Sequence, residues 1–199
     1  MKKTLFASII AAQLLTQLHA GGDIEPVEMN EPEMMEHEAL EESTFYVVVA
    51  GLVDFGDTVE HEGIELNGDT NIGYGIDLGY RIGNGFAVEY DFTYARNSVS
   101  RTENGVDEEA RGTYYTSAID LVYTYEATEH IGIFAKVGYE YEWETISDYD
   151  IDSKEHDFVF GAGLEIAMNK SYKLLFEYEY SLIESPRGPS LFAGVMYNF

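Results

Sequence analysis

Acidic side chains recur at every second residue through much of this sequence, and few basic side chains accompany them. Pairs such as Glu140 and Glu142, or Glu177 and Glu179, have the spacing that places two carboxylates on one face of an extended strand. The charged positions with this spacing are Asp77, Arg81, Glu89, Asp91, Asp120, Lys136, Glu140, Glu142, Glu165, Glu177 and Glu179. Only two of them are basic. If the set is enclosed, some carboxylates must be protonated, reach water or hold a cation, because an unpaired buried charge is costly.

Three aspartates form a second group with possible metal chemistry. Asp148, Asp150 and Asp152 alternate as at the start of a calcium loop. Ser153 stands where such a loop needs glycine, and no glutamate follows at the closing position. The motif is therefore incomplete, and the simpler interpretation is a solvated acidic surface.

The spacing of histidine and serine indicates no catalytic nucleophile with its base. The residues two places after His61, His130 and His156 are Gly63, Gly132 and Phe158. A nucleophile needs a base within hydrogen-bond reach. We expect neither an enzyme nor a cofactor.

The elements that must position the acidic set are strands, because apolar residues alternate with polar ones in seven of eight expected strand segments. In residues 131–143, for example, Ile131, Ile133, Val137 and Tyr139 share one face, and Lys136 and its neighbours share the other. The expected strands are 45–55, 72–81, 86–94, 115–125, 131–143, 158–167, 174–182 and 191–199. The first is apolar on both faces, so its faces cannot be assigned from the pattern.

The connections between these strands alternate in length. Short turns lie at Gly83-Asn84-Gly85, around Thr128 and around Asn169, and longer polar loops are expected at 56–69, 97–113 and 144–157, with a shorter one at 185–189. This alternation is typical of an antiparallel up-and-down barrel with short turns at one end and long loops at the other. We predict an all-β, eight-stranded antiparallel up-and-down transmembrane β-barrel.

The apolar face should point outward to lipid, because the polar face carries many glycines that suit a narrow interior. Large aromatic residues also gather near the strand ends. One expected ring contains Tyr80, Phe86, Tyr123, Tyr125, Tyr197 and Phe199, and the other contains Tyr94, Tyr115, Tyr141, Trp143 and Phe158. Two aromatic rings around an aliphatic band are typical of a lipid-facing surface.

The N-terminal region predicts export. Lys2 and Lys3 precede an interrupted apolar stretch that ends near Ala20, so residues 1–20 are expected to be a cleaved signal peptide. Residues 21–43 are acidic and should form a disordered periplasmic tail before a barrel at 44–199. The formal net charge of −26 excludes nucleic-acid binding through phosphate contacts, and the absence of cysteine excludes disulfides.

Taken together, the signal peptide, the strand pattern, the unequal loops and the ending Val195-Met196-Tyr197-Asn198-Phe199 carry a resemblance. The chain resembles the small eight-stranded outer-membrane proteins, such as the OmpA transmembrane domain, OmpX and the opacity-type porin-family proteins. The resemblance implies a salt-bridge network inside the barrel, centred on Lys136 and Arg81. It also implies that Phe199 is read by the barrel-assembly machinery.

This family resemblance also implies a Gram-negative outer membrane as the location, with the N-terminal tail and the C-terminus in the periplasm. The expected partners are outer-membrane lipid and lipopolysaccharide, with divalent cations bridging acidic loops to the anionic leaflet. We expect a structural or surface-interaction role with the interior plugged by a polar network, since eight strands leave little room beyond their own side chains. The alternative is a narrow cation-permeable channel.

Overall fold

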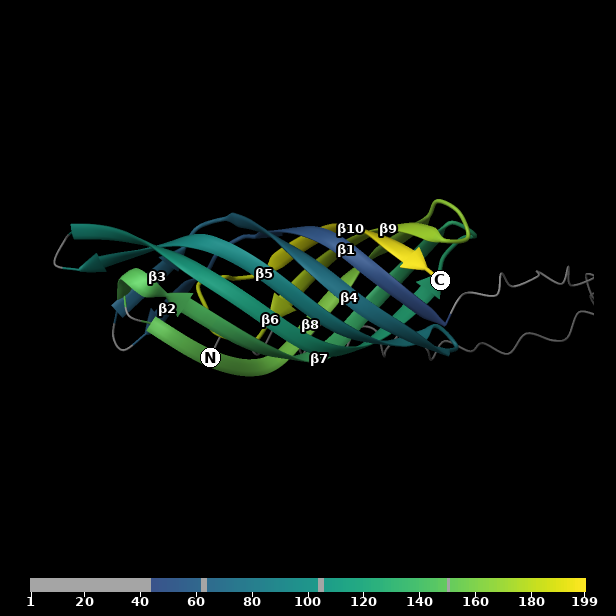
Figure 1. The fold of residues 1–199 in the computed structure, drawn as a ribbon, viewed down its shortest axis with the longest axis horizontal. Helices are drawn as coiled ribbons and strands as arrows, with labels where there is room; N and C mark the ends of the chain where they lie inside the picture. Colours follow the sequence, from purple (N-terminus) through teal and green to yellow (C-terminus); the bar gives the residue numbers. More distant parts are fainter. Residues whose placement is uncertain (1–43, 62–63, 104–105, 150) are drawn as a thin grey trace, which may run out of the picture. The chain divides into compact units, whose positions relative to one another are not determined.

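The structure is a computed structural model that describes residues 44–61, 64–103, 106–149 and 151–199 (Figure 1). The predicted signal peptide at 1–20 and the acidic tail at 21–43 lie outside the described residues and stay predictions. Chain contacts divide the molecule into residues 1–38 and 39–199, and the second unit contains all the described structure. No helix in the described ranges is long and apolar enough to span a membrane.

Eight antiparallel strands close into a barrel, which confirms the predicted fold (Figure 1). They are β1 (Phe45–Asp54), β4 (Asn71–Gly83), β5 (Phe86–Glu103), β6 (Val106–Glu126), β7 (Ile131–Ile146), β8 (Ile151–Ala167), β9 (Tyr172–Ser181) and β10 (Ser190–Asn198). Each strand pairs with the next in this series, and β1 pairs with β10 from Tyr46↔Asn198 to Asp54↔Ser190. Closure pairs all the backbone edges, as lipid requires.

The turns at one end of the barrel are short, as predicted. Between β4 and β5, φ is positive at Gly83 (98°), Asn84 (56°) and Gly85 (80°), a run of left-handed conformation that glycine and asparagine tolerate. Between β8 and β9, Asn169 Oδ1 accepts hydrogen bonds from the backbone of Ser171 at 2.9 Å and Tyr172 at 3.0 Å. We call this end of the barrel the turn end.

The loops predicted at 97–113 and 144–157 were wrong, because these segments are largely strand. β5 and β6 stay paired to Glu103↔Val106, and β7 and β8 stay paired to Ile146↔Ile151 around the 3₁₀ turn Ser147–Tyr149. The predicted loop at 56–69 holds a hairpin of β2 (Thr58–His61) and β3 (Ile64–Gly68), and Leu66 of β3 pairs with Arg101 of β5. We call this longer end the extended end.

The extended end has an apolar core of its own, which explains why it is ordered. Leu66, Val99, Ala110 and Ile146 form a buried cluster, with Val59 packed against it. These residues alternate with acidic and hydroxyl side chains, so the average composition of each segment reads as a polar loop. Only the recurrence of an apolar residue at every second position indicates that these segments are strands.

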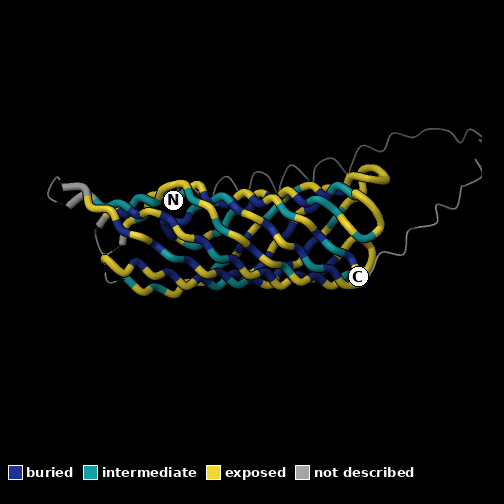
Figure 2. Tube along the Cα trace, turned by 45° about the horizontal axis from the view of Figure 1, so that its top comes forward, coloured by how far each residue is buried: buried dark blue, intermediate teal, exposed yellow. Residues whose placement is uncertain are grey.

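Burial alternates along every barrel strand (Figure 2). The first strand, whose faces the sequence left open, points Tyr46, Val48, Ala50 and Leu52 inward. There they join Phe192 and Met196 of β10 and Phe134 of β7 in an apolar interior cluster. Both faces of β1 are apolar because its inner face packs in this cluster, while its outer face lies among the exposed apolar side chains on the outside of the barrel.

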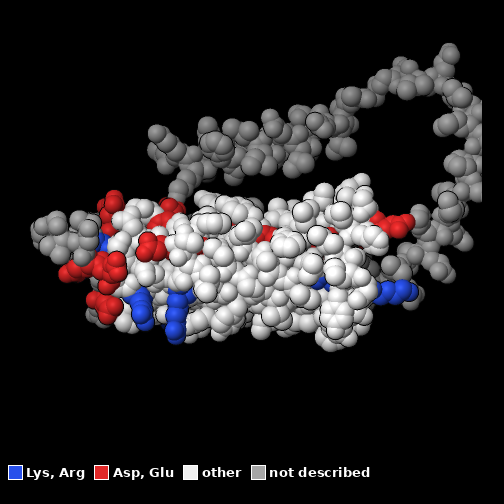
Figure 3. All heavy atoms as spheres, turned by 90° about the horizontal axis from the view of Figure 1, so that it is seen from above, with Lys and Arg blue, Asp and Glu red and all other residues white. Residues whose placement is uncertain are grey.

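Exposed apolar side chains form a belt around the outside of the barrel, and on the face shown in Figure 3 the exposed acidic side chains gather mainly toward the ends. Ile119, for example, is 64% exposed at the middle of β6. Aromatic pairs mark both edges of the belt. Phe86 and Tyr123 have ring centroids 4.8 Å apart at the turn end, and Tyr94 and Tyr115 have theirs 5.0 Å apart toward the extended end. The predicted outward direction of the apolar face is confirmed.

Candidate functional site: the charged barrel interior

Lys136 lies at the centre of a buried ion cluster inside the barrel. Its Nζ lies 2.7 Å from Asp91 Oδ2, 2.7 Å from Glu177 Oε1 and 3.1 Å from Glu179 Oε2. Its side chain is 3% exposed. The cluster therefore connects β7 with β5 and β9 across the interior, and a single cation compensates several carboxylates.

Glycines on the inner face make room for these long side chains. Gly161 of β8 lies opposite Lys136 in register and also pairs with Glu179 of β9. A Cβ at Gly161 would lie 2.7 Å from both Cγ and Cε of Lys136. The lysine therefore reaches the β9 carboxylates by passing over a strand position that has no side chain.

Carboxylates outnumber cations in this cluster. Asp120, on β6, is 1% exposed, and neither of its side-chain oxygens has a hydrogen-bond partner among the described residues. Asp91 Oδ1 is likewise without one. Asp77 lies directly opposite Asp91 in the β4–β5 register. The interior thus carries the acidic excess that the sequence suggested.

The second buried cation is Arg187, which the sequence reasoning did not select. It lies in the segment between β9 and β10, and its Nη2 is 2.8 Å from Glu140 Oε1 while its Nε is 2.9 Å from Glu142 Oε2. Burial alone would lower the pKa of this guanidinium, but Glu140 and Glu142 more than offset that effect and raise the pKa above its ordinary value.

Backbone hydrogen bonds hold the Arg187 segment across the extended end. The carbonyl oxygens of Pro186 and Arg187 accept from the backbone of Asp57 and Gly56, each at 3.0 Å. Gly188 follows with a φ of 70°. A single arginine flanked by proline and glycine was the available signal, but the sequence alone indicated a surface loop.

Arg81, which the family resemblance implied as a centre of the network together with Lys136, lies toward the turn end. It donates a hydrogen bond to Asn198 Oδ1 at 2.8 Å and lies 4.3 Å from the centroid of the Tyr46 ring. The Tyr46 hydroxyl in turn donates to Glu89 Oε1 at 2.5 Å. Arg81 therefore contributes to a separate group near the start of β1 and the end of β10.

The remaining predicted residues are placed as follows. Glu165 lies 3.0 Å from Lys173 through Oε2 and Nζ near the turn end. Phe199 follows β10 with 73% exposure, and its ring centroid is 5.1 Å from that of Tyr197. Asp148 lies in the 3₁₀ turn and Asp152 in β8, whereas Asp150 lies outside the described residues, so the three-aspartate metal motif stays a prediction.

A closed eight-stranded barrel with an apolar outer belt, two aromatic edges and a charged interior defines an integral outer-membrane β-barrel. The chain belongs to the family described as outer membrane protein beta-barrel domain, whose family model matches residues 33–199. No curated protein sequence matches it.

Solved structures with the same fold come from several bacteria. OprG from Pseudomonas aeruginosa superposes with a TM-score of 0.65 at 11% identity, covering 79% of this chain and 97% of OprG. Neisserial surface protein A superposes with a TM-score of 0.57 at 19% identity, covering 79% of this chain and 98% of that protein. Ail, the attachment invasion locus protein of Yersinia pestis, superposes with a TM-score of 0.54 at 18% identity, covering 79% of this chain and 99% of Ail. That structure of Ail is a complex with the heparin analogue sucrose octasulfate. At these identities the likeness shows the fold alone.

Proposed function

We propose that this protein is an outer-membrane barrel with a plugged interior that acts through its extended end, in a structural or surface-interaction role. The observation that carries the proposal is the pair of buried cations. Lys136 links β5, β7 and β9, and Arg187 ties a loop to β7. The apolar cluster around Tyr46, Phe134 and Phe192 fills further interior space. An interior bridged by ion pairs and packed side chains favours a plug over a water-filled path.

The proposed orientation has the extended end outside the cell and the turn end in the periplasm. β1 begins and β10 ends at the turn end, as the Tyr46↔Asn198 pair indicates, so the N-terminal tail and the C-terminus would both be periplasmic. Short periplasmic turns and longer outer segments are the arrangement of outer-membrane barrels. Exposed Phe199 would then face the barrel-assembly machinery from the periplasmic side.

Basic side chains on the outer surface support lipopolysaccharide and other outer-membrane lipids as partners. Arg96 and Arg111 are exposed on neighbouring strands, close to each other in the β5–β6 register, and exposed Lys154 pairs with Trp143 across β7 and β8. These cations lie just beyond the aromatic edge of the belt, at the level expected for lipid phosphates. Divalent cations would bridge the acidic end to the same anionic leaflet.

A non-enzymatic role fits the contacts of His156. This histidine lies on the outer face, and its Nδ1 is 2.6 Å from the hydroxyl of Tyr139, which is a structural contact at the aromatic edge. Two of the similar folds are named a surface protein and an attachment protein, which supports use of such a barrel at the cell surface. The acidic extended end (Figure 3) would repel an anionic ligand such as the sulfated heparin analogue bound by Ail.

The second candidate is a narrow cation-permeable channel, and buried Asp120, whose oxygens have no hydrogen-bond partner among the described residues, favours it. Planar-bilayer conductance of the refolded chain separates the two functions, with insertion verified by the mobility shift of unheated protein on gels. We expect no conductance from the inserted protein. Measurable conductance from Arg187→Ala would show that the assay detects an opened barrel. A steady cation-selective current from the unchanged protein would overturn the plugged-barrel proposal in favour of the channel.

A further inference from the structure

Strands β7 and β8 carry an acidic ladder on their inner face at the extended end. In register, Glu140 pairs with Asp157, Glu142 with Glu155, and Glu144 with Ser153. Like charges directly opposite each other on one sheet face repel and destabilise the pairing. A ladder of five carboxylates therefore needs cations close to it.

The protein supplies a cation to only part of this ladder. Arg187 pairs with Glu140 and Glu142, whereas no salt bridge among the described residues reaches Glu144, Glu155 or Asp157. Glu144 is 8% exposed, and although the Tyr114 hydroxyl lies beside its carboxylate, its Oε1 has no hydrogen-bond partner in the part of the chain that the structure describes. A buried carboxylate oxygen in this state is costly unless a ligand contacts it.

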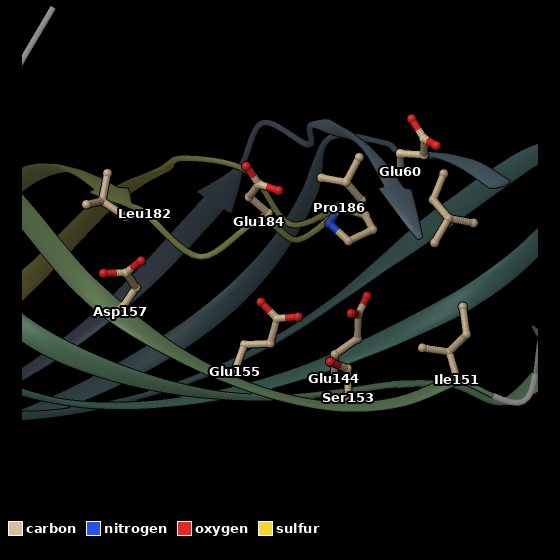
Figure 4. Close-up of a pocket in the computed structure, with 11 residues that line it drawn as sticks. Glu60, Glu144, Ile151, Ser153, Glu155, Asp157, Leu182, Glu184 and Pro186 are labelled. Carbon is tan, nitrogen blue, oxygen red and sulfur yellow. The ribbon is translucent and has the colours of Figure 1, made fainter. Parts of the chain in front are cut away.

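Glu144 borders a pocket of about 330 Å³ that we call the mouth pocket (Figure 4). Its other carboxylates are Glu60 of β2, Glu155 and Asp157 of β8, and Glu184 from the segment after β9. In Figure 4, Glu144 and Glu155 rise side by side from the same pair of strands, with Glu184 on the opposite wall. The pocket size is at the lower end of the range for small-molecule sites.

Apolar side chains form a smaller part of the pocket wall. Leu66, Ile151, Leu182 and Pro186 line the same pocket. No three acidic or histidine side chains of the described residues are grouped closely enough to hold a metal ion. Carboxylates spread around the pocket, with some apolar surface among them, match a flexible organic cation better than a single ion, because its charged ends can meet separate carboxylates while its methylene groups cover the apolar part of the wall.

We propose that the mouth pocket binds a small linear polyamine, whose ammonium groups alternate with methylene segments. Glu144 would take the most deeply placed ammonium group, and Glu155, Asp157 and Glu184 would contact the others. The site deepens the surface-interaction role proposed above and rests on it for its physiological meaning, since the extended end must face the medium to meet such a ligand.

Binding of spermidine to the refolded full chain in detergent micelles tests the proposal by isothermal titration calorimetry. We expect saturable binding of one spermidine per chain that weakens with added salt. Glu144→Gln should weaken it about tenfold, because it removes the buried charge. Glu155→Gln should weaken it about threefold, because that carboxylate is exposed and screened.

Glu109→Gln is the matched control, since it removes one exposed acidic charge from β6 at the same end, outside the pocket. We expect it to leave the affinity for spermidine unchanged. Equal weakening by Glu109→Gln, or no saturable binding at all, would overturn the proposal. The gel mobility shift checks folding, and exposed Glu155 keeps the test valid if Glu144→Gln does not fold.

A titration with Ca²⁺ alone distinguishes a metal site from a polyamine site. Tighter binding of Ca²⁺ than of spermidine, with the same dependence on Glu144 and Glu155, would overturn the polyamine assignment. The measurement in micelles is independent of conductance and of orientation in the membrane. A conducting barrel that still binds spermidine in the mouth pocket would therefore overturn the proposed function and leave this inference standing.

Discussion

Arg187 Nη2 lies 2.8 Å from Glu140 Oε1, although the two residues are 47 positions apart and one belongs to a loop while the other belongs to a barrel strand. Both side chains are almost completely buried, at 3% and 2% exposure. The contact brings a segment that would otherwise extend into solvent across the extended end. Removal of either partner should therefore affect both the stability and the closure of the barrel.

Arg187→Ala should lower the free energy of unfolding by about 3 kcal/mol or more, since Glu140 and Glu142 would stay buried without their cation. Urea unfolding of the protein in lipid vesicles, followed by tryptophan fluorescence of Trp143, measures the change. Arg111→Ala removes an exposed arginine from β6 and should change the stability by less than about 1 kcal/mol. Equal effects of the two substitutions would contradict the special role of Arg187.

Lys136→Met should destabilise the barrel by about 3–5 kcal/mol, because it leaves Asp91, Glu177 and Glu179 together without their shared cation. Adding Glu177→Gln to Lys136→Met should recover part of the loss, since one of the uncompensated charges is then gone. A double-mutant cycle from urea unfolding measures this coupling. If the two substitutions change the free energy of unfolding additively, the 2.7 Å contact between Lys136 Nζ and Glu177 Oε1 carries no energetic coupling.

Gly161→Ala should destabilise the protein by about 1–3 kcal/mol, because the added Cβ overlaps the Lys136 side chain inside a packed interior. Gly51→Ala is the matched control: Gly51 is exposed on β1, and a Cβ there meets no atom within 4 Å. The midpoint of thermal or urea unfolding compares the two variants. Equal destabilisation would mean that loss of glycine in a strand, and not the passage of Lys136, causes the effect.

Ile119→Arg should reduce insertion into vesicles, with a cost of about 2–4 kcal/mol for an arginine near the bilayer midplane. Ile119 is 64% exposed in the middle of the belt, between Tyr90 and Tyr139 in register. Ser98→Arg, at an exposed position of β5 beyond the aromatic edge, should insert normally. The folded fraction on unheated gels measures insertion. Normal insertion of Ile119→Arg would contradict the position of Ile119 near the bilayer midplane.

Most of the strands and the direction of their faces follow from local properties of the sequence. The alternation of Ile131, Ile133, Val137 and Tyr139 with smaller or charged residues is a period-two pattern, and every barrel strand except β1 carries it independently of its neighbours. The tight turn at Gly83-Asn84-Gly85 is equally local, because its positive φ angles need residues of those types. The number of barrel strands and the lipid-facing surface could therefore be predicted.

The partners of the interior charges could not be predicted in the same way. Lys136 could be placed on the inner face from its spacing, but its distance to Glu177 depends on the strand register and on the glycine at position 161 between them. Arg187 lies in a segment without period-two alternation, and the resemblance implied Lys136 and Arg81 as the centres of the network. The mouth pocket likewise brings together Glu60, Glu144 and Glu184 from three separated segments.

Local periodicity thus determined which side a residue occupies on every barrel strand except β1, because the alternation within one strand does not depend on the other strands. Closure of the barrel and the course of the 182–189 segment decided which of those residues meet. Contacts between residues tens of positions apart arise only when all strands are paired in one register, and a register is a property of the whole barrel and not of any single segment.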